Sequence, residues 1–274
     1  MGGRNGGSRS STTGGGTGGY GSAAGTGIPA GATGSVPPPQ QNSVLQQGQG
    51  FVPVGQYNVP LDQLKNVDDA TMAQILRDAQ NVDMPLHLAD GRDATQQLVY
   101  VLGYNAPPTV LDHAAFQQFV KDNNATVFSR SVSQGTFKTT AGSTKKLQDA
   151  QVAQLWISDP YNYIGGKRGG MVHGAGAYFD KGSGNTGYGS YTYRMAFNPK
   201  VARVGTHAQI DRDYQKWANS HPQAAREVTR MVNASDKSGT MKSVKALIAG
   251  YNVINGNGGY HVVINRDAAI IDGG

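Results

Sequence analysis

Residues 163–198 read YIGGKRGGMVHGAGAYFDKGSGNTGYGSYTYRMAFN. Glycine recurs every few residues there, between aromatic residues such as Tyr178, Phe179 and Tyr188. Glycines let a backbone approach a flat ligand or adopt positive φ, and aromatic rings can stack on such a ligand. The same pattern fits a glycine-rich loop that leads into an edge strand. Spacing alone leaves both interpretations open.

Composition limits the class of protein. The chain has 274 residues, 39 of them glycine, and is 38% hydrophobic, which predicts one folded domain plus a segment that packs no core. The absence of cysteine excludes disulfides and thiol catalysis. No apolar run is long enough to cross a bilayer, and the first residues lack the apolar region of a secretory signal. We therefore expect a soluble protein without a membrane partner.

The net charge weakly favours an anionic partner. The formal net charge of +6 suits nucleic acid or another anionic partner, but the basic residues are scattered along the chain. The acidic residues are more informative, because Glu227 is the single glutamate among 18 acidic residues. A mechanism that needs a catalytic glutamate therefore has one candidate.

The chain divides into three parts. Residues 1–56 consist mainly of Gly, Ser, Thr, Pro and Gln, which predicts a disordered tail. An alternative is an arm that orders against partner subunits. Residues 57–124 are expected to form a helical subdomain, and residues 125–274 the remaining domain.

Three helices are expected in the helical subdomain. The first begins at Asp68 or Asp69, the second at Asp93 and the third at Asp112, since aspartate is a favoured helix cap. Gly103 is the expected end of the second helix. The apolar residues at helical spacing are Met72, Ile75 and Leu76, then Leu98, Val99 and Leu102, then Phe116, Phe119 and Val120.

The period changes to that of a strand over residues 126–132. Arg130 falls on the same face as the apolar Phe128 and Val132. Such an arginine is either an edge residue that extends to solvent or one held for an anionic ligand.

Helices and short strands alternate after residue 145. We expect helices over 146–157, over 207–232 with a break near Pro222, and over 242–249, ending at Gly250. Strands are expected over 193–204, with a turn at Asn198, and over 251–254, 260–264 and 268–271. The predicted fold class is α+β with a largely antiparallel core.

Several sequence patterns resemble familiar functional motifs, but the sequence around them does not support those functions. Residues 182–187 match G-x-G-x-x-G, but a strand rather than a helix follows, which argues against a dinucleotide-binding Rossmann site. The six histidines show no i, i+4 pair, and no metal site is predicted. The serines near Ser131 lack a nucleophile elbow, so serine hydrolase chemistry has no support.

Three separate blocks together resemble the ADP-ribosyltransferase fold. Residues 128–131 resemble the first core strand of that family, and residues 173–189 resemble its G-x-G-x-Y-F segment. Residues 250–266 resemble the terminal strand that carries the catalytic glutamate. Over residues 95–272 the chain is similar to ADP-ribosyltransferase-like minor capsid or head-associated proteins of tailed bacteriophages.

The resemblance implies an NAD site and its residues. It assigns catalytic positions to Arg130, Tyr178 and His261, and it implies NAD as substrate. The residues that it implies for NAD binding are Arg130, Ser131, His173, Gly174, Gly176, Tyr178, Ser183 and Tyr188. Tyr178 and Tyr188 are expected to line one cleft, with Arg130 across from them.

The chain departs from the family at the catalytic glutamate. Residues 258–261 read GGYH where the glutamate is expected, and Glu227 lies in a helical stretch. A carboxylate at that place stabilises the positive charge that develops on the ribose when the nicotinamide bond breaks. His261, or Tyr260 in a register shifted by one residue, takes its place, whereas Asp267 and Asp272 would need a different register. NAD binding is therefore better supported than NAD cleavage.

The leading hypothesis is a phage virion-associated protein that binds NAD and transfers ADP-ribose to a host protein, in the virion and then in the host cytoplasm. The alternative is a structural head protein that keeps the fold without the chemistry, with other virion head proteins as partners. Nucleic-acid binding through the basic surface is a third hypothesis, and it predicts a steep salt dependence of affinity.

Overall fold

The computed structural model describes residues 55–82, 93–104, 106–132, 135–138, 144–147, 149–158, 174–182, 184, 189–235, 239–256 and 259–274. All of them belong to one compact unit of the chain. The N-terminal tail predicted for residues 1–56 lies almost entirely outside the described residues.

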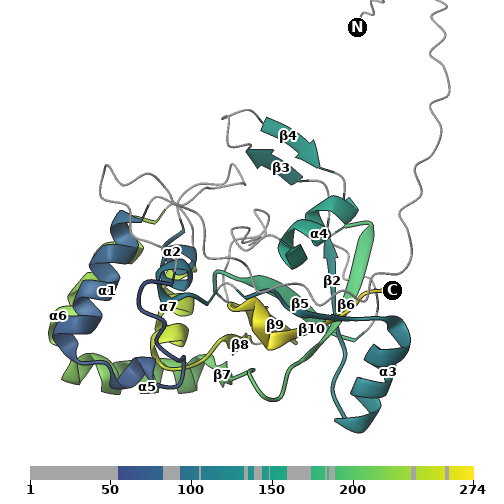
Figure 1. Cartoon of the computed structure of the whole chain (residues 1–274). Helices are drawn as coiled ribbons and strands as arrows, with labels where there is room; N and C mark the ends of the chain where they lie inside the picture. Colours follow the sequence, from purple (N-terminus) through teal and green to yellow (C-terminus); the bar gives the residue numbers. More distant parts are fainter. Residues whose placement is uncertain are drawn as a thin grey trace, which may run out of the picture. The chain divides into compact units, whose positions relative to one another are not determined.

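An eight-stranded sheet forms the centre of this unit (Figure 1). The strand order is β1-β10-β6-β2-β5-β9-β8-β7. The strands are β1 (Thr109–Leu111), β2 (Phe128–Val132), β5 (Ala177–Lys181), β6 (Tyr191–Phe197), β7 (Val204–Thr206), β8 (Val253–Asn255), β9 (Tyr260–Val263) and β10 (Ala269–Asp272). Only the outermost pairs in this sheet, β1 with β10 and β7 with β8, are parallel. The structure therefore confirms a mixed α/β protein with a largely antiparallel sheet.

Helices and one small hairpin complete the described residues. The hairpin pairs β3 (Gly135–Lys138) with β4 (Thr144–Leu147). The helices are α1 (Asp69–Asn81), α2 (Ala94–Leu102), α3 (His113–Asp122), α4 (Asp149–Ser158), α5 (His207–Ser220), α6 (Pro222–Asn233) and α7 (Thr240–Ile248), with short 3₁₀ turns η1 (Leu64–Asn66) and η2 (Arg266–Ala268).

The predicted caps form as the sequence indicates. The side chain of Asp68 accepts a hydrogen bond from the backbone of α1, and Asp93 and Asp112 do the same for α2 and α3. Gly103 ends α2 in the left-handed conformation, with φ of 79°, and Pro222 is the first residue of α6. These starts and ends confirm the local predictions, because caps depend on few neighbours.

The helices of residues 57–124 divide between two cores. The buried faces of α1 and α2 share one large core with α5, α6 and α7, and α1 lies beside α6 (Figure 1). By contrast, α3 places Phe116 against Ala196 and Ile270 of the sheet. The helices of the large core therefore come from both ends of the described chain.

Three local predictions need correction. The strand, the turn at Asn198 and a second strand form, but the second strand begins only at Val204, and β2, β5, β9 and β8 lie between it and β6. The amide nitrogen of Asn198 donates to the carbonyl of Ala268, and the loop then crosses to Arg203, which is held by Asn252. The helix expected from residue 146 begins at Asp149, since residues 144–147 pair as β4. β1 was not predicted, because three residues are too few to show alternation.

The fourth correction concerns Arg130. Its strand, β2, lies between β6 and β5 in the middle of the sheet, so Arg130 is not an edge residue. Its side chain is buried, with 7% of the residue surface exposed.

Candidate functional site

The two faces of the sheet carry different chemistry. Side chains alternate along each strand, and directly paired residues in antiparallel strands point to the same side. Phe128 pairs with Lys181, and Ser129 pairs with Asp180, which fixes the register of β2 against β5. Arg130 therefore points to the same side as Phe179, and Tyr178 points to the opposite side. We call these sides the Arg130 face and the Tyr178 face.

The three blocks that carry the family resemblance become three neighbouring strands. They are β2, β5 and β9, which lie side by side in the middle of the sheet. The chain forms β3, β4 and α4 between β2 and β5, and it forms β6 to β8 and α5 to α7 between β5 and β9. The sheet nonetheless brings the three blocks together.

Two rows of mostly polar side chains cross the Tyr178 face. The first row runs over β6, β2, β5 and β9 as Arg194, Ser129, Asp180 and Tyr260. The second runs over the same strands as Thr192, Ser131, Tyr178 and Val262. We call these eight residues the polar rows.

Apolar cores lie on both sides of the polar rows. On one side Ile254 and Ile264 pack into the large helical core, which Val262 and Tyr178 of the rows also join, and on the other Ala196 and Ile270 pack under α3. A polar strip between two apolar regions is unlike a purely structural sheet face, which is apolar where helices cover it. Within the strip Ser129 and Ser131 are buried, whereas Tyr178, Asp180 and Tyr260 are half-buried.

Hydrogen bonds order the hydroxyls of the polar rows. The hydroxyls of Ser131 and Thr192 share a hydrogen bond of 2.8 Å, and the hydroxyl of Ser129 donates to the carbonyl of Gly184 at 2.7 Å. The phenol of Tyr178 donates to the carbonyl of Gly174 at 2.7 Å. The Tyr178 ring is therefore fixed in direction.

Asp180 is the one acidic residue in the polar rows. It is half-buried, and burial raises the pKa of its carboxyl above the ordinary value. In the described part of the chain its carboxylate makes no hydrogen bond and no ion pair.

The turn before β5 explains why residue 174 is a glycine. Gly174 has φ of 138°, and a Cβ atom there would lie 2.7 Å from Cδ1 of Ile254 and 2.9 Å from Oγ of Ser243. The hydroxyl of Ser243, on α7, donates to the carbonyl of Ala175 at 2.8 Å. Gly174 and Gly176 are buried. At Gly174 the glycine permits close contact with α7 and β8.

A third row crosses the Arg130 face. Tyr193 pairs with Arg130, and Phe179 pairs with His261. The guanidinium carbon of Arg130 lies 5.9 Å from the centre of the Phe179 ring, within cation–π range. Trp156 of α4 covers this part of the face, with its ring centre 5.6 Å from that of Phe179. Arg130 is thus part of an aromatic core.

His261 belongs to an aromatic cluster at the margin of that core. Its ring centre lies 4.6 Å from that of Phe128 and 5.5 Å from that of Phe197. Burial lowers the pKa of His261, and the nearby Lys181 ammonium lowers it further, while the backbone of Gly259 opposes the change. The imidazole is therefore neutral at pH 7.

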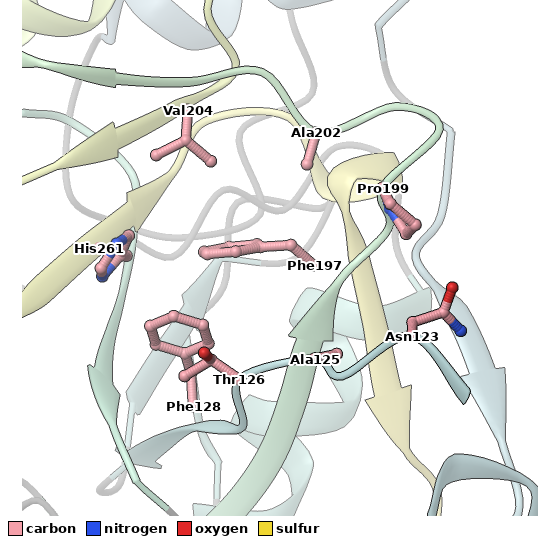
Figure 2. A pocket seen from close by; sticks show the side chains of 9 residues that line it. All are labelled: Asn123, Ala125, Thr126, Phe128, Phe197, Pro199, Ala202, Val204 and His261. Atoms are coloured by element: carbon pink, nitrogen blue, oxygen red, sulfur yellow. The ribbon is translucent and has the colours of Figure 1, made fainter. Parts of the chain in front are cut away.

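A hollow of about 350 Å³ opens beside this cluster. Figure 2 shows the rings of Phe128 and Phe197 and the imidazole of His261 close together, while Asn123 and Pro199 lie on the other side. The lining residues are Asn123, Ala125, Thr126, Phe128, Phe197, Pro199, Ala202, Val204 and His261. None of them is a carboxylate, and the hollow is separated from the polar rows by the sheet.

The predicted site residues therefore do not form one group. Ser131 and Tyr178 share the Tyr178 face, while Arg130 and His261 share the Arg130 face. The expectation that Arg130 lies across a cleft from Tyr178 does not match this register. His173, Ser183 and Tyr188 lie outside the described residues.

The other acidic candidates have structural partners or surroundings. Glu227 on α6 pairs with Arg230 at 2.9 Å. Asp272 bonds Arg194 and lies 3.0 Å from Nδ1 of His113. Burial raises the pKa of Asp267 to about 6.

Asp180 and Ser129 are absent from the site residues predicted from the sequence, and Tyr260 is among them only as an alternative to His261. The available signal was alternation: within β2 it already separates Ser129 and Ser131 from Arg130. Which of the two sets faces Tyr178 depends on the register between strands, which spacing does not give.

The described residues lack two further kinds of feature. None of their helices has both the length and the hydropathy needed to cross a bilayer. They contain no group of three or more His, Asp or Glu side chains that could hold a metal ion.

A comparison of the chain with models of known protein families, with curated proteins and with solved structures found no match.

Proposed function

We propose that this chain is an ADP-ribosyltransferase-like protein of a phage particle and that it binds NAD on the Tyr178 face. One observation supports the proposal above the others. The three sequence blocks that resemble the family form the adjacent strands β2, β5 and β9, with Ser131 and Tyr178 on one face. The particle and the host cytoplasm enter from the sequence resemblance alone.

The polar rows fit one end of NAD in their chemistry. The rings of Tyr178 and Tyr260 offer flat surfaces, and Asp180 offers a negative charge for a positively charged nicotinamide ring. The diphosphate fits less well, because Arg130 points to the other face and Arg194 is already bonded to Asp272. We therefore assign the nicotinamide and its ribose to the polar rows and leave Arg130 out of the binding set.

The chain's own residues would then act by orientation. Tyr178 is half-buried and fixed by its bond to Gly174, so it would meet a ligand without further ordering, while Ser131 is buried and bonded to Thr192. NAD, when bound, supplies the ADP-ribosyl group and the leaving nicotinamide. Tyr260 occupies the position on β9 that faces Asp180, and it takes the place of the family's glutamate if the resemblance is shifted by one residue from His261.

The test exploits two neighbouring residues on opposite faces. Tyr260→Glu places a carboxylate on the Tyr178 face, and His261→Glu places the same group on the Arg130 face. We expect Tyr260→Glu to raise NAD hydrolysis about 10- to 1000-fold, the range for one well-placed electrostatic group. His261→Glu should leave hydrolysis unchanged and lower the melting temperature, because it puts a charge into an aromatic cluster.

The measurement is release of labelled nicotinamide from NAD by the full chain, with host lysate added in a parallel reaction to detect transfer. A gain in His261→Glu alone would place the site on the Arg130 face and contradict the proposal. Failure of the full chain to bind NAD in a calorimetric titration would contradict it altogether.

The second function is a structural head protein that keeps the fold without the chemistry. The specific observation in its favour is the burial of Arg130 against Phe179 and under Trp156, which uses the family's NAD-contacting arginine as a core residue. It predicts incorporation into particles together with no NAD binding.

A further inference from the structure

Asp180 stands out in the polar rows because its charge has no counterpart among the residues that the structure describes. Arg194 is the cation of the same row, but β2 lies between their strands, a separation of about 10 Å at ordinary strand spacing. Arg194 is instead bonded to Asp272, with His113 beside it. Lys181 follows Asp180 in the chain and points to the other face.

The neighbours of Asp180 leave its charge uncompensated. Ser129 and Tyr260 are its direct partners across the sheet, at the short distance between facing side chains. The hydroxyl of Ser129 already donates its hydrogen bond to the carbonyl of Gly184. A half-buried carboxylate without a cation costs free energy, and burial accordingly raises its pKa.

The surroundings select a particular kind of cation. Tyr260 pairs with Asp180 across the sheet, and Tyr178 lies two residues before Asp180 on the same face of β5, with its phenol bonded to Gly174. A carboxylate that faces an aromatic residue suits a flat cationic ring, which stacks on the aromatic ring while its charge meets the carboxylate. A small metal ion would need more oxygen ligands, and the described residues hold no such group.

We propose that Asp180 recognises the positive charge of the oxidised nicotinamide ring and its ribose on the Tyr178 face. This inference rests on the proposed function and deepens it, because it names the residue that replaces the family's glutamate as the negative group. The resemblance places the family's glutamate on the strand that is β9 in this chain. Asp180 lies instead on β5, the neighbour of β9 in the sheet.

The experiment compares NAD⁺ with NADH, whose nicotinamide ring is uncharged. Calorimetric titrations use the full chain, Asp180→Asn and the control Asp122→Asn. Asp122 is exposed on α3 and accepts a hydrogen bond from Gln118, so it is an aspartate outside the polar rows. We expect the wild-type chain and Asp122→Asn to bind NAD⁺ about 10-fold more tightly than NADH, as one favourable charge contact allows.

In Asp180→Asn the two affinities should become equal. Asp180→Ser repeats the test with a smaller neutral side chain, and melting curves show that each variant is folded. Equal affinities in the wild-type chain, or a preference that survives in both variants, would overturn the role of Asp180 while leaving NAD binding intact. Absence of any binding to the wild-type chain would overturn the proposed function, and the role of Asp180 with it.

Discussion

Arg130 illustrates how one residue changes its interpretation once its face is known. Its guanidinium lies against Phe179 inside an aromatic core, so its removal should affect folding rather than ligand binding. We predict that Arg130→Ala lowers the free energy of unfolding by about 2 kcal/mol, from lost packing and cation–π contact. The folded variant should keep the NAD affinity of the wild type.

Denaturant unfolding and calorimetry measure the two effects separately. Arg212→Ala is the matched control, since Arg212 is an exposed arginine on α5. An Arg130→Ala variant with unchanged stability and lost NAD binding would return Arg130 to the binding site.

Asp267 gives a prediction about pH. Its carboxyl is mainly buried, its Oδ1 has no hydrogen-bond partner among the described residues, and burial raises its pKa to about 6. The folded state therefore binds the proton more tightly than the unfolded state, and stability falls as pH rises from about 4 to 6. The loss amounts to about 2–3 kcal/mol.

Asp267→Asn should remove this part of the pH dependence and make the protein more stable than wild type at pH 7. Urea unfolding at pH 4, 5, 6 and 7 tests it. If the free energy of unfolding changes with pH in the same way for both proteins, Asp267 ionises normally in the folded state.

At the scale of elements, the turn before β5 depends on Gly174. We predict that Gly174→Ala destabilises the fold by about 2 kcal/mol, because φ of 138° strains an L-residue and the new Cβ meets Ile254 and Ser243. Gly182→Ala isolates the strain alone, since φ is 116° there but nothing lies within 4 Å. Gly184→Ala is the neutral control, with no neighbour in that range.

Melting temperatures should therefore fall in the order Gly184→Ala, Gly182→Ala, Gly174→Ala. Equal temperatures for the last two would mean that the contact with α7 and β8 contributes nothing.

Element starts and ends could be predicted where the signal is local. Asp68, Asp93 and Asp112 cap their helices, and Gly103 ends α2, because each acts on the adjacent turn. Strand neighbours could not be predicted, because β6 and β7 are close in sequence and far apart in the sheet. For the same reason alternation separated Arg130 from Ser131 but could not say which of them shares a face with Tyr178.

At the scale of the whole molecule, the large core joins α1 and α2 to helices from the C-terminal half. The composition of the preceding residues provides no apolar periodicity for that core. We predict that a chain beginning near residue 54 keeps the melting temperature of the full chain. A large fall on truncation would mean that the removed segment packs on the folded unit.

The central claim is that NAD lies on the Tyr178 face, and contacts between the ligand and labelled tyrosines test it most directly. The sample is the full chain with ¹³C only in tyrosine, and the measurement is the isotope-filtered NOE from the nicotinamide ring protons. Tyr178→Phe and Tyr260→Phe assign the signals. The account predicts NOEs to Tyr178 and Tyr260. NOEs that leave both tyrosines out and, in a sample labelled in phenylalanine and histidine, reach Phe128, Phe197 or His261 beside the hollow would contradict it.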